Sequence, residues 1–243
     1  MKSFQECRLY TFIDTAYLAG RDVRTVTRQL CEGGADVIQL RAKGAHSDQI
    51  RELAQLILPI TEGAGIGLVI NDEPEVARQT GACAVHLGQE DFFDAGFLNR
   101  AEVTGDPSQT QLGLSTHAPA QAQRSLAAGP DYIAIGPVYP TATKATALPV
   151  TLEYVRWAAK NVSIPWFAIG GITLGNLPDV LAAGATRICV VSAILQAPDI
   201  AKACAQFKEQ LLSVVPNATH SVPSRMLSNR SVETSPDGSD RQP

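Results

Sequence analysis

The sequence lacks a CxxC pair, a long apolar run and an excess of positive charge, and each absence excludes a class of protein. Its five cysteines are odd in number, which is typical of buried thiols in a reducing compartment and unlike a disulfide framework or a zinc site. No apolar run approaches the roughly 18 residues of a membrane span, and the start "MKSFQECRLYTFIDT" lacks the apolar stretch of a signal peptide. The net charge of −4 gives no reason to expect nucleic-acid binding. We therefore expect a cytoplasmic protein with neither a membrane nor a nucleic acid as partner; the composition is compatible with a homo-oligomer.

Several catalytic signatures are also missing. There is no HExxH motif and no nucleophile elbow around a serine or cysteine, which disfavours zinc hydrolysis and Ser-His-Asp chemistry. The segment "FIDTAYLAGRD" after the first apolar run carries no GxGxxG turn, which argues against an open dinucleotide-binding sheet. His86, within "CAVHLG", is as compatible with a satisfied core histidine as with a site residue.

Eight short apolar runs rich in β-branched residues are present, and segments with helical spacing separate them. The runs span 8–13, 36–41, 67–71, 83–87, 111–115, 131–136, 164–170 and 187–192. One helical face follows Asp22, a second follows the capping candidate Ser47, and a third follows Pro198-Asp199. Glycines in "EGGAD", "QTGAC", "AAGPD" and "AAGAT" stand where a helix must turn back into a strand. Eight such units predict a single (β/α)₈ TIM barrel, which is an α/β fold with a parallel sheet.

The composition changes near the end of the chain. From Pro216 onward the sequence contains six serines, four prolines and no aromatic residue. Such a segment cannot bury enough apolar area to offset its ordering entropy. We therefore predict a barrel domain over residues 1–215 and a disordered Ser/Pro-rich tail over residues 216–243, in which a docking motif is the alternative.

Polar residues follow the predicted strands at the end where such barrels carry their chemistry. In "QLRAK", strand alternation sends Gln39 and Arg41 to one side, with Lys43 just beyond. The alternative for Arg41 and Lys43 is snorkelling at the surface. Asp72 and Asp91 end the next two strand units and suit Mg²⁺, although both could instead be helix N-caps, a role that fits Asp72 before "EPEVARQ".

Hydroxyls, a further cation and glycines end the remaining strands. "GLSTH" offers Ser115, and "GPVYPTATK" offers Thr141, Thr143 and Lys144. Cations and hydroxyls around a divalent metal describe a pyrophosphate pocket. The Gly-Gly pair in "AIGGIT", with Ser192 in "VVSAI", stands where such barrels bind phosphate through backbone N–H groups, unless the glycines only form a tight turn. The sequence therefore predicts two anion sites across one barrel mouth.

These residues together resemble one family. The motifs "GGADVIQLRAK", "IND", "VHLGQED", "GLSTH", "DYIAIGPVYPTATK", "AIGGIT" and "VVSAI" occur in order between residues 8 and about 212. They resemble thiamine-phosphate synthase, whose sister branch is the thiazole tautomerases. After Lys144 this sequence departs from the family's pattern: "ATALPVTLEY" has Pro149 and no glycine before Leu152, which indicates a stiffer loop.

The resemblance implies a transferase of thiamine biosynthesis that acts on two small molecules. It joins 4-amino-2-methyl-5-hydroxymethylpyrimidine diphosphate to 4-methyl-5-(β-hydroxyethyl)thiazole phosphate, giving thiamine phosphate and pyrophosphate. The implied ligands of the pyrimidine diphosphate are Gln39, Arg41, Lys43, Asn71, Ser115 and Lys144, of which Arg41, Ser115 and Lys144 would be catalytic. The implied ligands of the cofactor Mg²⁺ are Asp72 and Asp91. Those of the thiazole phosphate are Thr141, Thr143, Gly171, Val191 and Ser192.

Two other functions remain open at this stage. A tautomerase would use His117 as a base, but it would leave the set of Arg41, Lys43, Asp72, Asp91 and Lys144 without a purpose. A catalytically silent barrel that only binds a ligand or partner would be expected to have lost a carboxylate or a lysine, and the sequence retains them.

Overall fold

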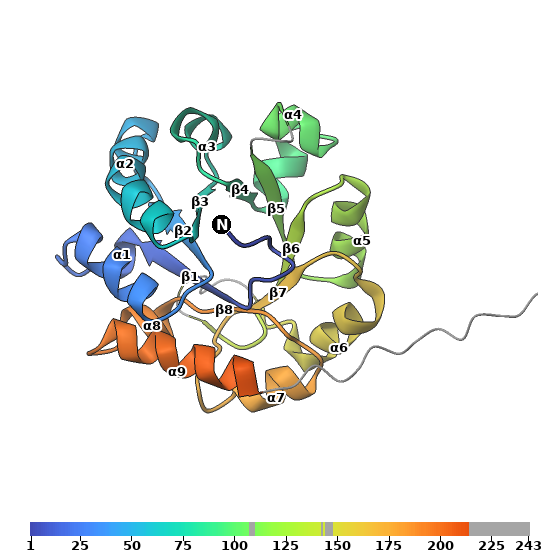
Figure 1. Cartoon of the computed structure of the whole chain (residues 1–243). Helices are drawn as coiled ribbons and strands as arrows, with labels where there is room; N and C mark the ends of the chain where they lie inside the picture. The colour runs from blue at the N-terminus through green and yellow to red at the C-terminus, as the bar shows by residue number, and fades with distance from the viewer. Residues whose placement is uncertain (107–109, 142, 144–147, 214–243) are drawn as a thin grey trace, which may run out of the picture.

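The computed structural model describes residues 1–106, 110–141, 143 and 148–213. It is a closed barrel of eight parallel strands in chain order (Figure 1). The strands are β1 (Leu9–Asp14), β2 (Val37–Arg41), β3 (Gly67–Asn71), β4 (Ala84–Leu87), β5 (Gln111–Thr116), β6 (Tyr132–Ile135), β7 (Trp166–Ile169) and β8 (Ile188–Cys189). Pairing of β1 with β8 closes the barrel. The predicted TIM barrel is confirmed, whereas Lys144, the boundary after residue 215 and the segment 216–243 lie outside the described residues.

Helices surround the strands as an outer ring (Figure 1). They are α1 (Val23–Glu32), α2 (Ser47–Gly63), α3 (Pro74–Thr80), α4 (Arg100–Thr104), α5 (Pro119–Ala127), α6 (Thr151–Asn161), α7 (Leu177–Ala182), α8 (Ser192–Leu195) and α9 (Ile200–Ser213), with the short turns η1 (Thr15–Tyr17) and η2 (Glu90–Asp94). Among the described residues, no helix has the length and apolar character to cross a membrane.

Local signals place most element boundaries, with two corrections. The helical face predicted after Asp22 is α1, and Asp22 is its N-cap, accepting a hydrogen bond from the Thr25 N–H at 2.9 Å. Ser47 is instead the first residue of α2, where its hydroxyl donates to Glu73, and His46 is the N-cap. The last predicted strand is also too long, since the chain turns after Cys189 and Ser192 already begins α8.

The prediction of buried thiols holds for part of the set. All five cysteines are free; Cys7, Cys189 and Cys204 are buried, but Cys31 and Cys83 are only partly so. Burial raises the pKa of the Cys7 thiol to about 12. The buried thiols therefore act as small core side chains, which is the common role of free cysteine in a protein interior.

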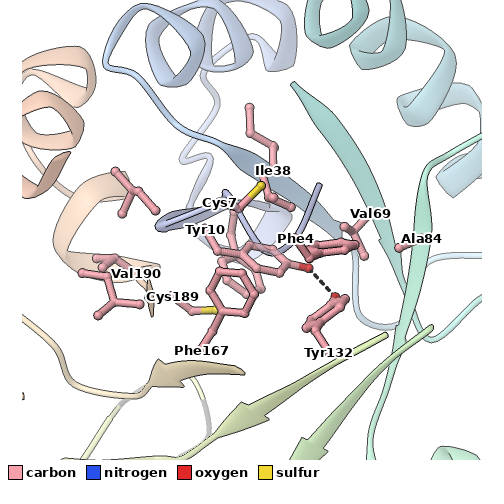
Figure 2. Close-up of a cluster of buried hydrophobic side chains, with 14 of the residues drawn as sticks. Phe4, Cys7, Tyr10, Ile38, Val69, Ala84, Tyr132, Phe167, Cys189 and Val190 are labelled. Carbon is pink, nitrogen blue, oxygen red and sulfur yellow. Dashed lines mark hydrogen bonds between the residues drawn. The ribbon is translucent and has the colours of Figure 1, made fainter. Parts of the chain in front are cut away.

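Aromatic side chains fill the barrel interior, and the N-terminal segment contributes one of them. In Figure 1 the N-terminus lies at the centre of the ring. Phe4 enters from this segment and is buried, with its ring centroid 4.2 Å from that of Tyr132 (Figure 2). Tyr10 and Phe167 pack edge to face beside them at 5.3 Å. The segment before β1 thus closes the N-terminal end of the barrel and leaves the other end for ligands.

Asp36 anchors this closed end. Its buried carboxylate accepts hydrogen bonds from Lys2 Nζ at 2.6 Å, from the backbone N–H groups of Arg8 and Leu9 at 2.9 and 3.0 Å, and from Lys208 Nζ. Burial alone would raise the pKa of this carboxyl, but the hydrogen bonds from the two ammonium groups hold it below its ordinary value of 3.8. Asp36 therefore ties the N-terminal segment, β1 and α9 together.

Asp36→Asn is expected to lower the free energy of unfolding at neutral pH by about 2 kcal/mol, because two ammonium groups lose their buried counter-charge. Since the folded-state pKa is depressed, the stabilisation is present above the unfolded value of 3.8 and is lost as the pH falls below it. Urea unfolding of both proteins between about pH 7 and pH 3 measures this difference. It should shrink only in the acid range, and a constant difference throughout would contradict this role of the carboxylate.

Candidate active site

The predicted site residues meet at one pocket at the C-terminal ends of the strands. Every predicted site residue that the structure describes lines it: Gln39, Arg41, Lys43, Asn71, Asp72, Asp91, Ser115, Thr141, Thr143, Gly171, Val191 and Ser192. Phe12, Ile169 and Ile172 supply apolar surface to the same pocket. The structure thus brings residues from all eight βα units to one mouth, with apolar and charged surface side by side.

Arg41, at the end of β2, is held by a buried partner. Its Nη1 lies 2.7 Å from Oδ2 of Asp14, the last residue of β1, whose side chain is only 1% exposed. The other carboxylate oxygen of Asp14 accepts a hydrogen bond from the Ala16 N–H at 3.0 Å. Arg41 is 15% exposed, so it is a fixed guanidinium at the pocket wall, and the surface-snorkelling alternative is wrong for it.

Asp72 lies directly after β3 in a left-handed backbone conformation with φ 63°. Such a conformation is uncommon for a residue other than glycine, and it recurs at functional sites. The carboxylate forms an ion pair with Lys43, and the backbone N–H donates to the His86 carbonyl at 2.9 Å. The N-cap of α3 is Glu73, so the alternative that Asp72 caps this helix is wrong.

Asp91 lies in the first turn of η2, after β4. Gly88 precedes it at a point where a β-carbon would lie 2.7 Å from Asp91 Oδ2, so the carboxylate occupies space that only glycine leaves free. Within the described ranges, no cluster of three or more His, Cys, Asp or Glu side chains could hold a metal by itself. Two carboxylates on one pocket nonetheless fit Mg²⁺, which takes one or two protein carboxylates and fills its shell with water and phosphate oxygens.

Ser115, near the end of β5, is fixed from two sides. Its backbone carbonyl accepts a hydrogen bond from Gln89 Nε2 at 2.6 Å, and its Oγ lies 2.9 Å from His86 Nε2. His86 is 8% exposed and reaches both the pocket and the interior, since its Nδ1 lies 3.1 Å from the Tyr132 hydroxyl. His86 is therefore both a hydrogen-bonded core histidine and a residue that lines the pocket.

The opposite wall includes two consecutive glycines. Gly170 and Gly171 have φ of 103° and 63°, and a β-carbon on Gly171 would meet the Pro140 carbonyl oxygen at 2.6 Å. Only glycine permits this close approach of two loops. Asn176 Nδ2 donates to the Gly171 carbonyl at 2.9 Å. The Thr143 hydroxyl lies 3.0 Å from the hydroxyl of Tyr17, which ties the loop after β6 to the loop after β1.

Asp14, Tyr17, Tyr10 and Tyr132 are not among the site residues that the sequence predicts. Asp14 ends β1 and so obeys the strand-end rule that identified Arg41, but its role depends on the register that pairs these two residues. His117, the base of the tautomerase alternative, lines the pocket, and its Nδ1 contacts the Gly136 carbonyl oxygen. No local sequence pattern predicts the contacts of Asp14 with Arg41, of Tyr17 with Thr143 or of His117 with Gly136.

Comparison with known proteins agrees with this geometry. A family profile described as thiamine monophosphate synthase matches residues 9–194. The chain is 43% identical over 196 residues to thiamine-phosphate synthase from Thermus thermophilus, and the match covers 77% of this chain and 88% of that protein. It is 36% identical over 204 residues to the enzyme from Halalkalibacterium halodurans, covering 84% and 94%. Thiamine phosphate pyrophosphorylase from Pyrococcus furiosus superposes with a TM-score of 0.75 at 28% identity, over 86% of this chain and 98% of that one. These matches show that the chain belongs to the thiamine-phosphate synthase family of transferases.

Proposed function

We propose that two walls of the barrel mouth divide the substrates of thiamine-phosphate synthesis between them. The reaction joins the pyrimidine diphosphate to the thiazole phosphate and releases pyrophosphate. The observation that carries the proposal is the meeting of the predicted cations, carboxylates, hydroxyls and glycines on one pocket. Neither a tautomerase nor a silent barrel would require that whole set.

The wall after β2 to β5 is proposed to bind the pyrimidine diphosphate. Arg41 offers a rigid fork of donors and Lys43 a mobile ammonium, two complementary ways to neutralise a pyrophosphate. Asn71 and Ser115 add neutral polar groups beside them, and Gln39 lies deeper in the same pocket. The carboxylates of Asp72 and Asp91 offset the charges of Arg41 and Lys43 at this wall, so the proposed Mg²⁺ would supply the further positive charge that a pyrophosphate needs.

Asp72 and Asp91 are the residues proposed to hold Mg²⁺ at this wall. When bound, the ion would neutralise charge on the pyrophosphate oxygens and so make pyrophosphate a better leaving group. Asp72 also pairs with Lys43, so one carboxylate can orient two cations toward the same phosphate group. Lys144, which lies outside the described residues, remains a predicted third cation.

The wall after β6 to β8 is proposed to bind the thiazole phosphate. Backbone N–H groups near Gly171, Val191 and Ser192 suit a phosphate because they can approach it closely and need no counter-charge. Thr141 and Thr143 add side-chain hydroxyls. The two anions would therefore lie on opposite walls, with their reacting carbon and nitrogen between them.

The chemistry then needs positioning and charge neutralisation rather than a covalent intermediate. The amino group of the pyrimidine can stabilise a benzyl-like cation once pyrophosphate departs, so a dissociative path suits the site. Arg41, Lys43 and the Ser115 hydroxyl would stabilise the charge that develops on the leaving oxygen. The backbone wall would hold the thiazole nitrogen in line with the cationic carbon.

An assay with both substrates tests this proposal. The purified chain is incubated with the pyrimidine diphosphate and the thiazole phosphate, in Mg²⁺ or in EDTA, and thiamine phosphate and pyrophosphate are quantified. We expect equal amounts of both products in Mg²⁺ and loss of both in EDTA, with neither substrate alone giving thiamine phosphate. Absence of product with both substrates and Mg²⁺ would contradict the function, and full activity in EDTA would contradict the metal site.

A further inference from the structure

We propose that Tyr132 and His86 are positioning residues that keep Ser115 as a hydrogen-bond donor toward the substrate. They belong to an interior hydrogen-bond chain of five side chains, from Gln39 through Tyr10, Tyr132 and His86 to Ser115. Gln39 Nε2 donates to the Tyr10 hydroxyl at 2.8 Å, and the two tyrosine hydroxyls lie 3.0 Å apart (Figure 2). Two more contacts, of 3.1 and 2.9 Å, lead through the His86 ring to Ser115.

The Gln39 amide nitrogen, the donor at one end, sets the donor-to-acceptor direction of the whole interior hydrogen-bond chain. Because the Gln39 amide nitrogen donates to Tyr10, the proton of the Tyr10 hydroxyl is available to Tyr132. Tyr132 can then donate to Nδ1 of His86, and a neutral ring that accepts at Nδ1 carries its proton on Nε2. That proton points to Ser115 Oγ, so the serine accepts from the ring and its own proton is free for the pocket.

This direction matters for the proposed function, on which the inference rests. A free Ser115 proton can be donated to an anionic oxygen of the leaving pyrophosphate, where charge develops in the transition state. In the opposite tautomer Ser115 would donate to His86 Nε2, and its lone pairs would face the anion instead. The interior chain therefore selects the serine orientation that stabilises the reaction.

Burial and aromatic packing keep the interior hydrogen-bond chain in place. Tyr10 and Tyr132 are 1% and 0% exposed, and burial holds the pKa of each hydroxyl well above its ordinary value, so both stay protonated. Phe4 stacks on the Tyr132 ring from the N-terminal segment. Buried polar groups that are fully paired fix a single arrangement, since an unpaired member would lose its hydrogen bond without regaining water.

The tautomer of His86 is directly measurable. In ¹⁵N-detected NMR of the folded chain near pH 8, with the ring signals assigned by their loss in His86→Gln, we expect a neutral ring protonated at Nε2 in the wild type. Tyr132→Phe removes the donor to Nδ1 and should shift part of the population to the Nδ1 tautomer. Tyr154→Phe is the matched control, because it removes another buried tyrosine hydroxyl. That hydroxyl donates to Thr116 Oγ1 at 2.7 Å and is not part of the interior hydrogen-bond chain, so the His86 signals should stay unchanged. A wild-type ring protonated at Nδ1 would overturn the proposal.

Kinetics separate positioning from a merely structural role. Tyr132→Phe should lower kcat about tenfold, roughly what one lost hydrogen bond to a charged group can cost, with little change in KM for the thiazole phosphate. In a Ser115→Ala background the same change should have no further effect, because the group it positions is gone. Equal losses in both backgrounds, or an equal loss in Tyr154→Phe, would overturn the proposal. If no variant makes thiamine phosphate, the proposed function fails while the tautomer measurement still decides the inference.

Discussion

Asp72→Asn is expected to lower kcat/KM by at least about a hundredfold, the largest effect on activity among the described residues, because it removes a carboxylate that we propose binds the metal at the leaving group. Asparagine is close in size to aspartate and is the side chain, apart from glycine, that best tolerates a left-handed backbone. The φ of 63° at this position should therefore cost the variant nothing. The lost ion pair with Lys43 is largely exposed, with 54% of the lysine side chain accessible, so its contribution to stability is small.

Two measurements isolate this effect. The variant should unfold at the wild-type temperature, and the Mg²⁺ concentration that gives half-maximal activity should rise. Asp48→Asn is the matched control, since Asp48 is an 81% exposed carboxylate paired with Arg51 on α2, away from the pocket. The control should keep wild-type activity. Wild-type kcat/KM in Asp72→Asn would exclude this carboxylate from the site.

Asp14→Ala is expected to give the largest loss of stability, about 3 to 5 kcal/mol, because it leaves the Arg41 guanidinium nearly buried without a counter-charge. The variant also loses the hydrogen bond from the Ala16 N–H to the removed carboxylate. For a chain of this size the midpoint of thermal unfolding should fall by about 10 °C. Activity should fall as well, because Arg41 loses the ion pair that fixes the position of its guanidinium at the pocket wall.

A second Arg–Asp pair provides the comparison. Asp48 and Arg51 lie 2.6 Å apart, close to the 2.7 Å between Arg41 and Asp14, but Asp48 is 81% exposed whereas Asp14 is 1% exposed. Asp48→Ala should change the free energy of unfolding by less than about 0.5 kcal/mol. Thermal unfolding of both variants therefore tests burial rather than geometry. Similar losses in the two would contradict the account of Asp14.

The barrel can be predicted from the sequence because its signals are local. Each apolar run and each glycine before a strand is readable within a few residues, and Gly34, Gly81, Gly129 and Gly184 all have the positive φ that such a turn requires. The sequence predicts the capping residue of α2 one position late, since the N-cap is His46. Ser47 is a good cap by type, but its hydroxyl bonds Glu73, at the start of α3, which the local sequence does not reveal.

Much of the site can also be predicted, because strand alternation and the strand-end rule place side chains without tertiary detail. Gln39 and Arg41, two residues apart on β2, both line the pocket. The contacts between strands could not be predicted in this way. The Asp14–Arg41 pair depends on the register of β1 against β2, and the interior chain joins side chains from five strands that meet only after closure. Phe4 lies outside any strand pattern, so its stacking on Tyr132 carries no sequence signal.

We propose that one wall of the mouth binds a metal-complexed pyrophosphate through Asp72 and Asp91. Crystals soaked with Mn²⁺ and pyrophosphate test it most directly, because the anomalous signal of manganese locates the ion without reference to activity. We expect an anomalous peak in contact with both carboxylates, with the diphosphate beside Arg41 and Lys43. A peak elsewhere in the barrel, or a diphosphate bound at the Gly171 wall, would contradict it.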